Sequence, residues 1–323
     1  MQPSQVLFQG EALPRALPVC DHYAGTEVRM RKALALQAEL GPVFDITFDC
    51  EDGAPVGKEA EHAQLVADIL LSSDNRFNRV GVRIHDPSHS CWKADVATLI
   101  KQAGKKIAFV MIPKVVSALQ TQTIIDEINH VAKTANIGRV IPIQVLIETH
   151  GALHEVHEIA ALEQVESLSF GLMDFVSAHH GAIPGSAMDR GQFDHPLVAR
   201  AMLEISAACH AHGKVASHNV CTNINDVAII ESDTLRAKNE FGFTRKWSIH
   251  PNQIPVIVKT LSPSPSEIEE ACSILLAAQA AQWGPIQHEG KLHDRASYRY
   301  FWTILQKAHL TGHAIPAKAE KLL

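Results

Sequence analysis

The chain has 323 residues, of which 46% are hydrophobic and 20% are charged, so it can bury a sizeable core. Its formal net charge of −6 and pI near 6.3, with scattered lysines and arginines, argue against a nucleic-acid partner. Because no apolar stretch approaches the length of a membrane span and the N-terminus lacks a signal-peptide pattern, we expect a cytoplasmic protein without membrane association.

Short apolar, β-branched runs alternate with longer segments of helical periodicity, which is typical of parallel strands joined by helices. The predicted strands cover residues 6–8, 44–50, 79–85, 106–113, 140–148, 167–174, 214–219 and 247–251. The predicted helices cover residues 57–71, 118–135, 195–213, 224–242, 263–283 and 295–309. This order favours an α/β fold, a (β/α)8 TIM barrel with a C-terminal helical extension, over an open doubly wound sheet. We expect a catalytic barrel domain over residues 1–260 and an extension over residues 261–323, which packs as a lid on the barrel or on a neighbouring subunit.

Several common site motifs are missing from the sequence. It contains no GxGxxG and no GxxxxGK[ST] pattern, so nucleotide-binding folds lack their fingerprint. Its six cysteines include no CxxC pair, and its 19 histidines form no HExxH pattern. We therefore expect reduced thiols and no zinc site.

Polar side chains follow most of the predicted strands. In a parallel barrel these strand ends meet at one rim, where the loops carry active-site residues. One carboxylate after a strand can equally be a helix cap or an ion-pair partner, so the prediction rests on the whole set. In strand order from the second to the eighth, the set is Glu51 with Asp52, Arg83, Lys114, Glu148, Asp174, Ser217 and His250.

Glu148 and Asp174 come from adjacent predicted strands, so their carboxylates could share an ion and leave positions for water and substrate. Hard oxygen ligands in so small a number suit Mg²⁺, although a structural explanation of the pair stays open. Arg83 is suited to gripping a carboxylate or stabilising an enolate oxygen. It could equally be the ion-pair partner of Asp49 or Glu51.

Seven blocks of the sequence share their order and spacing with one known family, from about residue 44 to residue 310. The blocks are FDCEDGAP followed by Lys58, VRIHDPS, IPKVVSA, VLIETHGAL, SFGLMDF, GFTRKWSIHPNQIPVI and PSPSEIEEA. They resemble the citrate lyase β-subunit-like branch of the HpcH/HpaI aldolase superfamily, and the IHP-x-Q block with xIET and xGxxDF is the specific part. The resemblance implies a TIM barrel that binds Mg²⁺ and makes or breaks a carbon–carbon bond between a CoA-thioester enolate and a 2-oxo acid. Malyl-CoA, citramalyl-CoA and citryl thioester are the implied substrate types.

The same resemblance assigns roles to single positions. Glu148 and Asp174 match the two metal ligands, and Arg83 matches the catalytic arginine that faces the substrate. Glu51 and Asp52 match an acidic pair that orders metal-bound waters and Arg83. The cluster of carboxylates after the second predicted strand is therefore expected to serve catalysis.

Two further matches lie outside the rim. Asp294 matches the tail aspartate that family members insert into a neighbouring subunit's site, which implies proton transfer in a homo-oligomer, a trimer or hexamer. Lys32 matches the lysine of the family's Lys-Ala pair and is the substrate-binding candidate. The chain departs from the family where Arg295 replaces a proline and His62 replaces an arginine. The N-terminal block matches poorly, so the CoA contacts stay unassigned.

Two other functions remain open. A metal-dependent 2-oxo-acid aldolase of the HpaI type would share the barrel and the metal pair. That type resembles a D-x-E-H block and a Q-x-E block, where this chain has Asp52 and Leu146 instead of the histidine and the glutamine. The second alternative is a non-catalytic barrel that binds a ligand or depends on partner subunits for an acyl carrier. No motif identifies the acyl group, because the shape of the loops determines this specificity. The physiological direction of the reaction also stays open.

Overall fold

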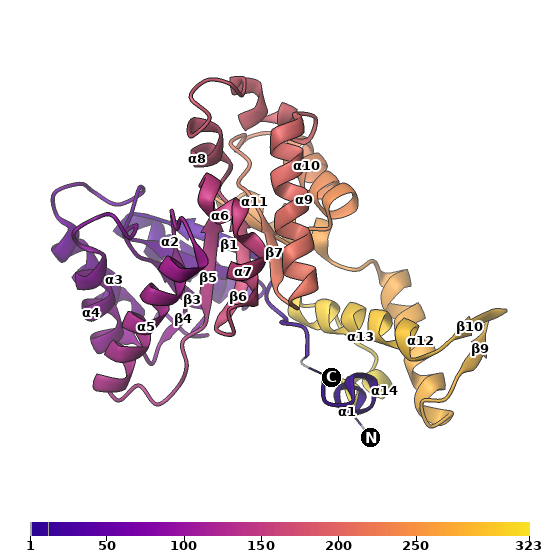
Figure 1. Ribbon diagram of the computed structural model, residues 1–323. Helices are drawn as coiled ribbons and strands as arrows, with labels where there is room; N and C mark the ends of the chain where they lie inside the picture. Colours follow the sequence, from indigo (N-terminus) through magenta and orange to yellow (C-terminus); the bar gives the residue numbers. More distant parts are fainter. Residues whose placement is uncertain (1, 12) are drawn as a thin grey trace.

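The computed structural model describes residues 2–11 and 13–323 of the chain. Its centre is a closed barrel in which eight parallel strands pair in chain order and the first closes on the last (Figure 1). The predicted (β/α)8 TIM barrel is therefore confirmed. The strands are β1 (Cys20–Ala24), β2 (Asp45–Asp49), β3 (Val80–Arg83), β4 (Ile107–Ile112), β5 (Ile143–Ile147), β6 (Val165–Phe170), β7 (Val215–His218) and β8 (Arg245–Ser248).

Helices surround the barrel and bury their apolar faces against the outer side of the strands, where the largest hydrophobic cluster lies. Among the described residues, no helix combines the length and hydrophobicity needed to cross a bilayer. The helices are α2 (Glu27–Leu40), α3 (Glu59–Leu71), α4 (Trp92–Ala103), α5 (Ala118–Thr134), α6 (His150–His154), α7 (Val156–Ala161), α8 (Leu172–Ser177), η1 (Gly185–Met188), η2 (Arg190–Phe193), α9 (Pro196–Ala211), α10 (Val227–Phe241) and α11 (Gln253–Leu261).

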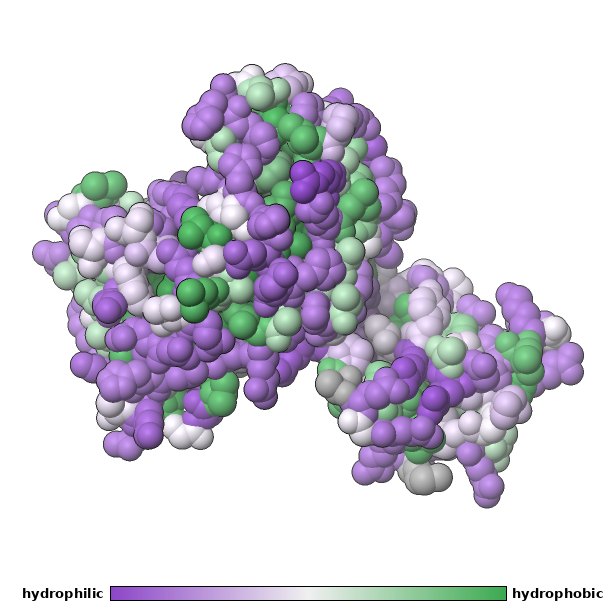
Figure 2. Space-filling view, viewed as in Figure 1, coloured by the Kyte–Doolittle hydropathy of each residue, from purple (hydrophilic) through white to green (hydrophobic). Residues whose placement is uncertain are grey.

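The remaining elements form a smaller lobe with its own hydrophobic cluster. It projects from the barrel, and the space-filling view shows it as a separate body beside the larger one (Figure 2). The predicted boundary at residues 260 and 261 stays a prediction. The lobe contains α1 (Pro3–Phe8), α12 (Pro265–Ala280), β9 (Ile286–His288), β10 (Lys291–His293), α13 (Arg295–Leu310) and α14 (Ala317–Glu320).

The prediction of a first strand at residues 6–8 was wrong. These residues belong to the helix α1, which begins with a proline and buries Leu7 and Phe8 against the lobe. The true first strand is β1, whose sequence CDHYA carries polar residues that point into the barrel. Asp21, for example, lies 3.3 Å from the buried guanidinium of Arg245. A polar interior strand lacks the apolar run that marks the other strands.

Another strand prediction extended too far. Residues 167–174 were predicted as one strand, but β6 ends at Phe170 and Asp174 lies in the first turn of the helix α8. Gly171 separates the two elements. Asp174 therefore reaches the rim from a helix and not from a strand end.

Gly81 on β3 is expected to be essential for barrel packing. A β-carbon at this position would lie 2.2 Å from the ring of Phe109, which fills the barrel interior from β4. Gly81→Ala should lower the free energy of unfolding by about 1–3 kcal/mol in a denaturant titration, because the core would be overpacked. Gly185→Ala is the control, since its β-carbon would meet no atom closer than 3.8 Å. Equal stability of the two variants would contradict the expected clash.

Candidate active site

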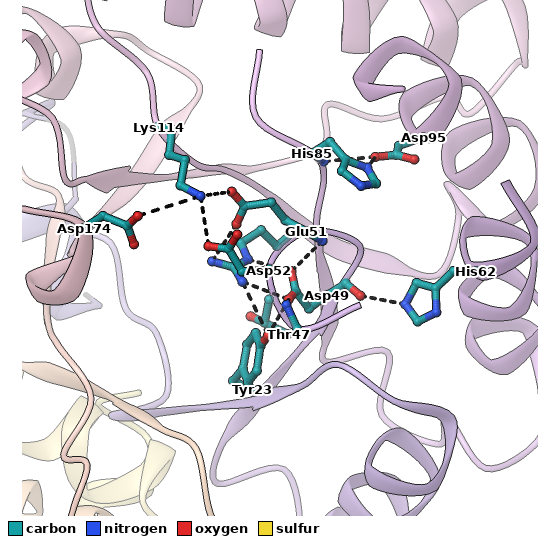
Figure 3. Close-up of polar contacts among 12 residues, drawn as sticks. Tyr23, Thr47, Asp49, Glu51, Asp52, His62, His85, Asp95, Lys114 and Asp174 are labelled. Carbon is teal, nitrogen blue, oxygen red and sulfur yellow. Dashed lines mark hydrogen bonds and ion pairs between the residues drawn. The ribbon is translucent and has the colours of Figure 1, made fainter. Parts of the chain in front are cut away.

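The polar rim of the barrel is organised around one buried ion pair (Figure 3). Asp49 ends β2 and Arg83 ends β3, and the register of the two strands sets these residues side by side. Arg83 donates from Nε to one Asp49 oxygen at 2.6 Å and from Nη2 to the other at 2.8 Å. Its Nη1 lies 3.0 Å from Glu51 Oε2. The guanidinium is thus fixed on two sides.

The turn after β2 places Asp49 for this role. The main-chain N–H groups of Glu51 and Gly53 donate to its two oxygens at 3.0 and 2.7 Å, and the hydroxyl of Tyr23 donates to it as well. A β-carbon at Gly53 would lie 1.6 Å from the Tyr23 hydroxyl oxygen, so this position requires glycine. One of the three clustered carboxylates, Asp49, is therefore a structural group, and the other two face the rim.

Both members of the ion pair are charged. Burial favours a neutral Asp49, but the Arg83 guanidinium and the hydrogen bonds hold the pKa of that carboxyl below its usual value. Arg83 also lies over the rings of Tyr23 and Trp247, 5.2 and 6.0 Å from their centroids. Asp49 accepts hydrogen bonds from Nε and Nη2, and Nη2 also donates to the Tyr23 hydroxyl at 3.4 Å. Nη1 forms the ion pair with Glu51 and keeps donor capacity for a ligand.

Lys114 connects the carboxylates of this rim. Its Nζ lies 2.7 Å from Glu51, 2.9 Å from Asp52 and 3.8 Å from Asp174. Burial opposes the charge of Lys114, but hydrogen bonds to Glu51 and Asp52 outweigh it and raise the pKa of the ammonium. The main-chain N–H of Lys114 donates to Glu148 Oε1 at 2.7 Å.

Glu148 and Asp174 differ in depth within the site. Glu148 is 3% exposed, whereas the side chain of Asp174 is 43% exposed. A β-carbon at Gly171 would lie 2.2 Å from Glu148 Oε2, so the glycine leaves room for this carboxyl. Burial, and then the charge of Asp174, raise the pKa of Glu148 to about 8. A cavity of about 130 Å³ opens beside them and is also lined by Arg83 and Trp247.

The donor set fits Mg²⁺ better than a metal that needs a full protein cage. Among the described residues, no group of three or more His, Cys, Asp or Glu side chains could hold a metal. Two carboxylates with open space beside them suit an ion that keeps several waters. The raised pKa of Glu148 indicates a place where a cation would relieve the repulsion from Asp174.

The structure thus gathers five of the predicted site residues. Two others, Lys32 and Asp294, lie elsewhere. Lys32 is exposed on α2. The pKa of His22 on β1 is lowered mainly by burial, then by the charge of His250 and then by the charge of Lys32. Asp294 caps α13 at its junction with β10, on the lobe away from this rim (Figure 1). The gathered residues are Glu51, Asp52, Arg83, Glu148 and Asp174.

Sequence reasoning assigned no role to several residues of the site. Tyr23 was missed because its strand was missed. Lys114 was placed at the rim, but no pattern showed that its ammonium contacts three carboxylates. Trp247 was included in a predicted strand, and only the structure shows that its ring lies beside Arg83 and the cavity.

The raised pKa of Glu148 predicts a specific pH dependence in metal-free protein. Between pH 4.5, the ordinary value, and about 8, the folded state holds a proton that the unfolded chain releases, so stability falls as pH rises. The loss is at most about 5 kcal/mol at 1.36 kcal/mol per unit. Denaturant titrations in chelator should show this fall for the wild type relative to Glu148→Gln, which has no group to titrate there. Parallel pH profiles would contradict it.

Comparison with known proteins agrees with this geometry. Residues 33–251 match the family described as HpcH/HpaI aldolase/citrate lyase. A crystal structure of a citrate lyase from Burkholderia xenovorans LB400 is 55% identical, covers 100% of both chains and gives a TM-score of 0.86. The L-malyl-CoA/beta-methylmalyl-CoA lyase of Cereibacter sphaeroides is 25% identical over 82% of this chain and 87% of its own.

The fold is also shared at greater distance. CitE from Mycobacterium tuberculosis, solved in complex with magnesium, acetoacetate and coenzyme A, is 22% identical with a TM-score of 0.66. That match covers 91% of this chain and 98% of CitE. The family match spans more than half of this chain. The chain therefore belongs to the HpcH/HpaI aldolase/citrate lyase family.

Proposed function

We propose that this protein is a Mg²⁺-dependent carbon–carbon lyase that acts on a 3-hydroxyacyl-CoA thioester. Malyl-CoA, citramalyl-CoA or citryl thioester would be cleaved to an acyl-CoA and a 2-oxo acid, or formed from them. One observation carries the proposal: the buried Glu148 lies with Asp174 and Arg83 around a single cavity. The name of the Cereibacter relative, a malyl-CoA lyase, supports the same substrate class.

The residues of the rim suit such a cleavage. Glu148 and Asp174 would hold Mg²⁺, which when bound supplies a Lewis acid for the oxygens of a 2-hydroxy or 2-oxo carboxylate. Arg83 lines the cavity and would donate an N–H bond to the oxygen that gains negative charge when the carbon–carbon bond breaks. Because Asp49 and Glu51 fix the guanidinium, this donor is oriented before the substrate arrives.

Protons must balance in this reaction. Cleavage removes the proton of the substrate hydroxyl, and the thioester α-carbon takes up a proton as the enolate is quenched. Asp294 of a neighbouring subunit is the proposed donor for that carbon. In a single chain this aspartate is an exposed helix cap, so the role requires an assembly.

The contacts of Asp52 bear on the HpaI-type alternative. In that reaction a base would stand at this position, but the Asp52 carboxylate accepts a hydrogen bond from the Lys114 ammonium at 2.9 Å. No histidine stands here, and the Lys114 ammonium occupies the carboxylate that replaces it, so the geometry favours the thioester lyase. Turnover of free CoA thioesters would also separate the proposal from a non-catalytic barrel.

Metal dependence is expected to run through Glu148 and Asp174. Glu148→Gln and Asp174→Asn each remove a negative ligand at nearly constant shape, so Mg²⁺ affinity and turnover should fall together, turnover by about 100-fold or more. The assay offers malyl-CoA, citramalyl-CoA and other 3-hydroxyacyl-CoA thioesters with and without Mg²⁺. Asp126→Asn, at an exposed position of α5, is the control and should keep activity. Full activity in chelator would exclude the metal, and inertness toward every thioester would exclude the function.

Asp294 is expected to act in trans. In the sequence it is flanked by two exposed large side chains, Leu292 (78% exposed) and Tyr300 (59% exposed), which suits a contact with another subunit. Mixing inactive Asp294→Ala subunits with inactive Glu148→Gln subunits should restore part of the activity, because each supplies what the other lacks. A fully active monomer in light scattering under assay conditions would contradict the role.

A further inference from the structure

Lys114 contacts the acidic rim with both its main chain and its side chain. The main-chain N–H fixes one oxygen of Glu148, and the ammonium reaches Glu51, Asp52 and Asp174 (Figure 3). These carboxylates belong to three segments that follow β2, β5 and β6, and Asp174 lies on the helix α8. A single residue on the loop after β4 therefore holds together a cluster of four acidic side chains.

The main chain of Lys114 is strained to reach this position. Its φ of 50° lies in the left-handed region, which disfavours residues with a side chain. The loop around it is fixed by neighbours, since Thr149 donates to the carbonyl of Val115 and Gln120 accepts from the N–H of Val116. Strained residues held by their surroundings occur preferentially at functional sites.

The charge balance of the cluster depends on this ammonium. Arg83 is the other cation in contact with these carboxylates, and it is already bound to Asp49 and Glu51. The ammonium of Lys114 lies 3.8 Å from Asp174 Oδ1, without a direct hydrogen bond. A cation on Asp174 would therefore feel the repulsion of a neighbouring ammonium across a short distance.

We propose that Lys114 is an internal counter-ion that positions Glu51 and Asp52 and opposes metal binding at Asp174. This inference rests on the proposed function, because it assumes that Glu148 and Asp174 hold the metal. The ammonium lowers the affinity for free Mg²⁺ and keeps the carboxylates in place until the metal arrives. Through Glu51, which also binds Arg83, it orients the guanidinium as well. Lys114 is therefore a positioning residue.

The proposal predicts two changes of opposite sign in one variant. Lys114→Gly keeps the N–H that binds Glu148 and suits the left-handed main chain, so the protein should remain folded. Loss of the ammonium should raise the affinity for Mg²⁺ alone about fivefold or more in isothermal titration calorimetry. The same variant should lose about tenfold or more in kcat, because Glu51 and Asp52 lose their partner. Lys114→Ala, which also lacks the ammonium, should shift Mg²⁺ affinity in the same direction.

The control is Lys93→Ala, which removes a positive charge from α4 without a contact to the cluster. Its Mg²⁺ affinity and kcat should equal those of the wild type. If Lys93→Ala tightens Mg²⁺ binding as much as Lys114→Gly does, net charge is the cause and the proposal is wrong. Unchanged or weaker Mg²⁺ binding by Lys114→Gly also overturns it.

One further variant separates this inference from the proposed function. If Glu148→Gln binds Mg²⁺ as tightly as the wild type, the metal site itself is misassigned, and both proposals fail. If Glu148→Gln loses Mg²⁺ while both Lys114 variants bind it with wild-type affinity, only the counter-ion proposal fails. Tighter binding with slower turnover in Lys114→Gly, against an unchanged Lys93→Ala, supports it.

Discussion

The ion pair of Asp49 and Arg83 is the constraint on which the site depends. A buried carboxylate stays ionised only with a strong partner, and here two parallel hydrogen bonds from the guanidinium provide it. The register of β2 and β3 sets the pair, so the fold fixes it without help from a ligand. Removing Arg83 would leave the buried Asp49 carboxylate without its cation, which is more costly than replacing both residues.

The rest of the rim extends from this pair in a chain of alternating charges. Glu51 lies between Arg83 and Lys114, and Lys114 reaches Asp52 and approaches Asp174. The opposite end of the barrel holds a second buried cluster around Arg245. A layer of apolar side chains that includes Phe109 separates the two. The charges of the rim are therefore insulated from those at the other end, and they face the loops, where a substrate would bind.

The sequence predicted the barrel and the gathering of polar residues at its rim, because parallel strands bring their ends together whatever their sequence. It could not place Asp174 on a helix, since the apolar run continued past Gly171 and hid the end of β6. It also missed β1, whose polar side chains are satisfied by partners about 25 residues or more distant in sequence, such as Thr47 for Asp21. Contacts of this kind leave no local pattern. The ammonium contacts of Lys114 depend on its left-handed main-chain conformation, which the residues beside it in the sequence do not predict.

The proposed reaction breaks a carbon–carbon bond at the rim by way of a thioester enolate. Its most direct test is cleavage of the identified 3-hydroxyacyl-CoA in D₂O, followed by mass spectrometry of the acyl-CoA product. We expect one deuterium at the α-carbon of the acyl-CoA product per turnover, because the enolate takes its proton from an exchangeable group. An acyl-CoA product without deuterium at this carbon, or free CoA released by hydrolysis of the thioester, would contradict it.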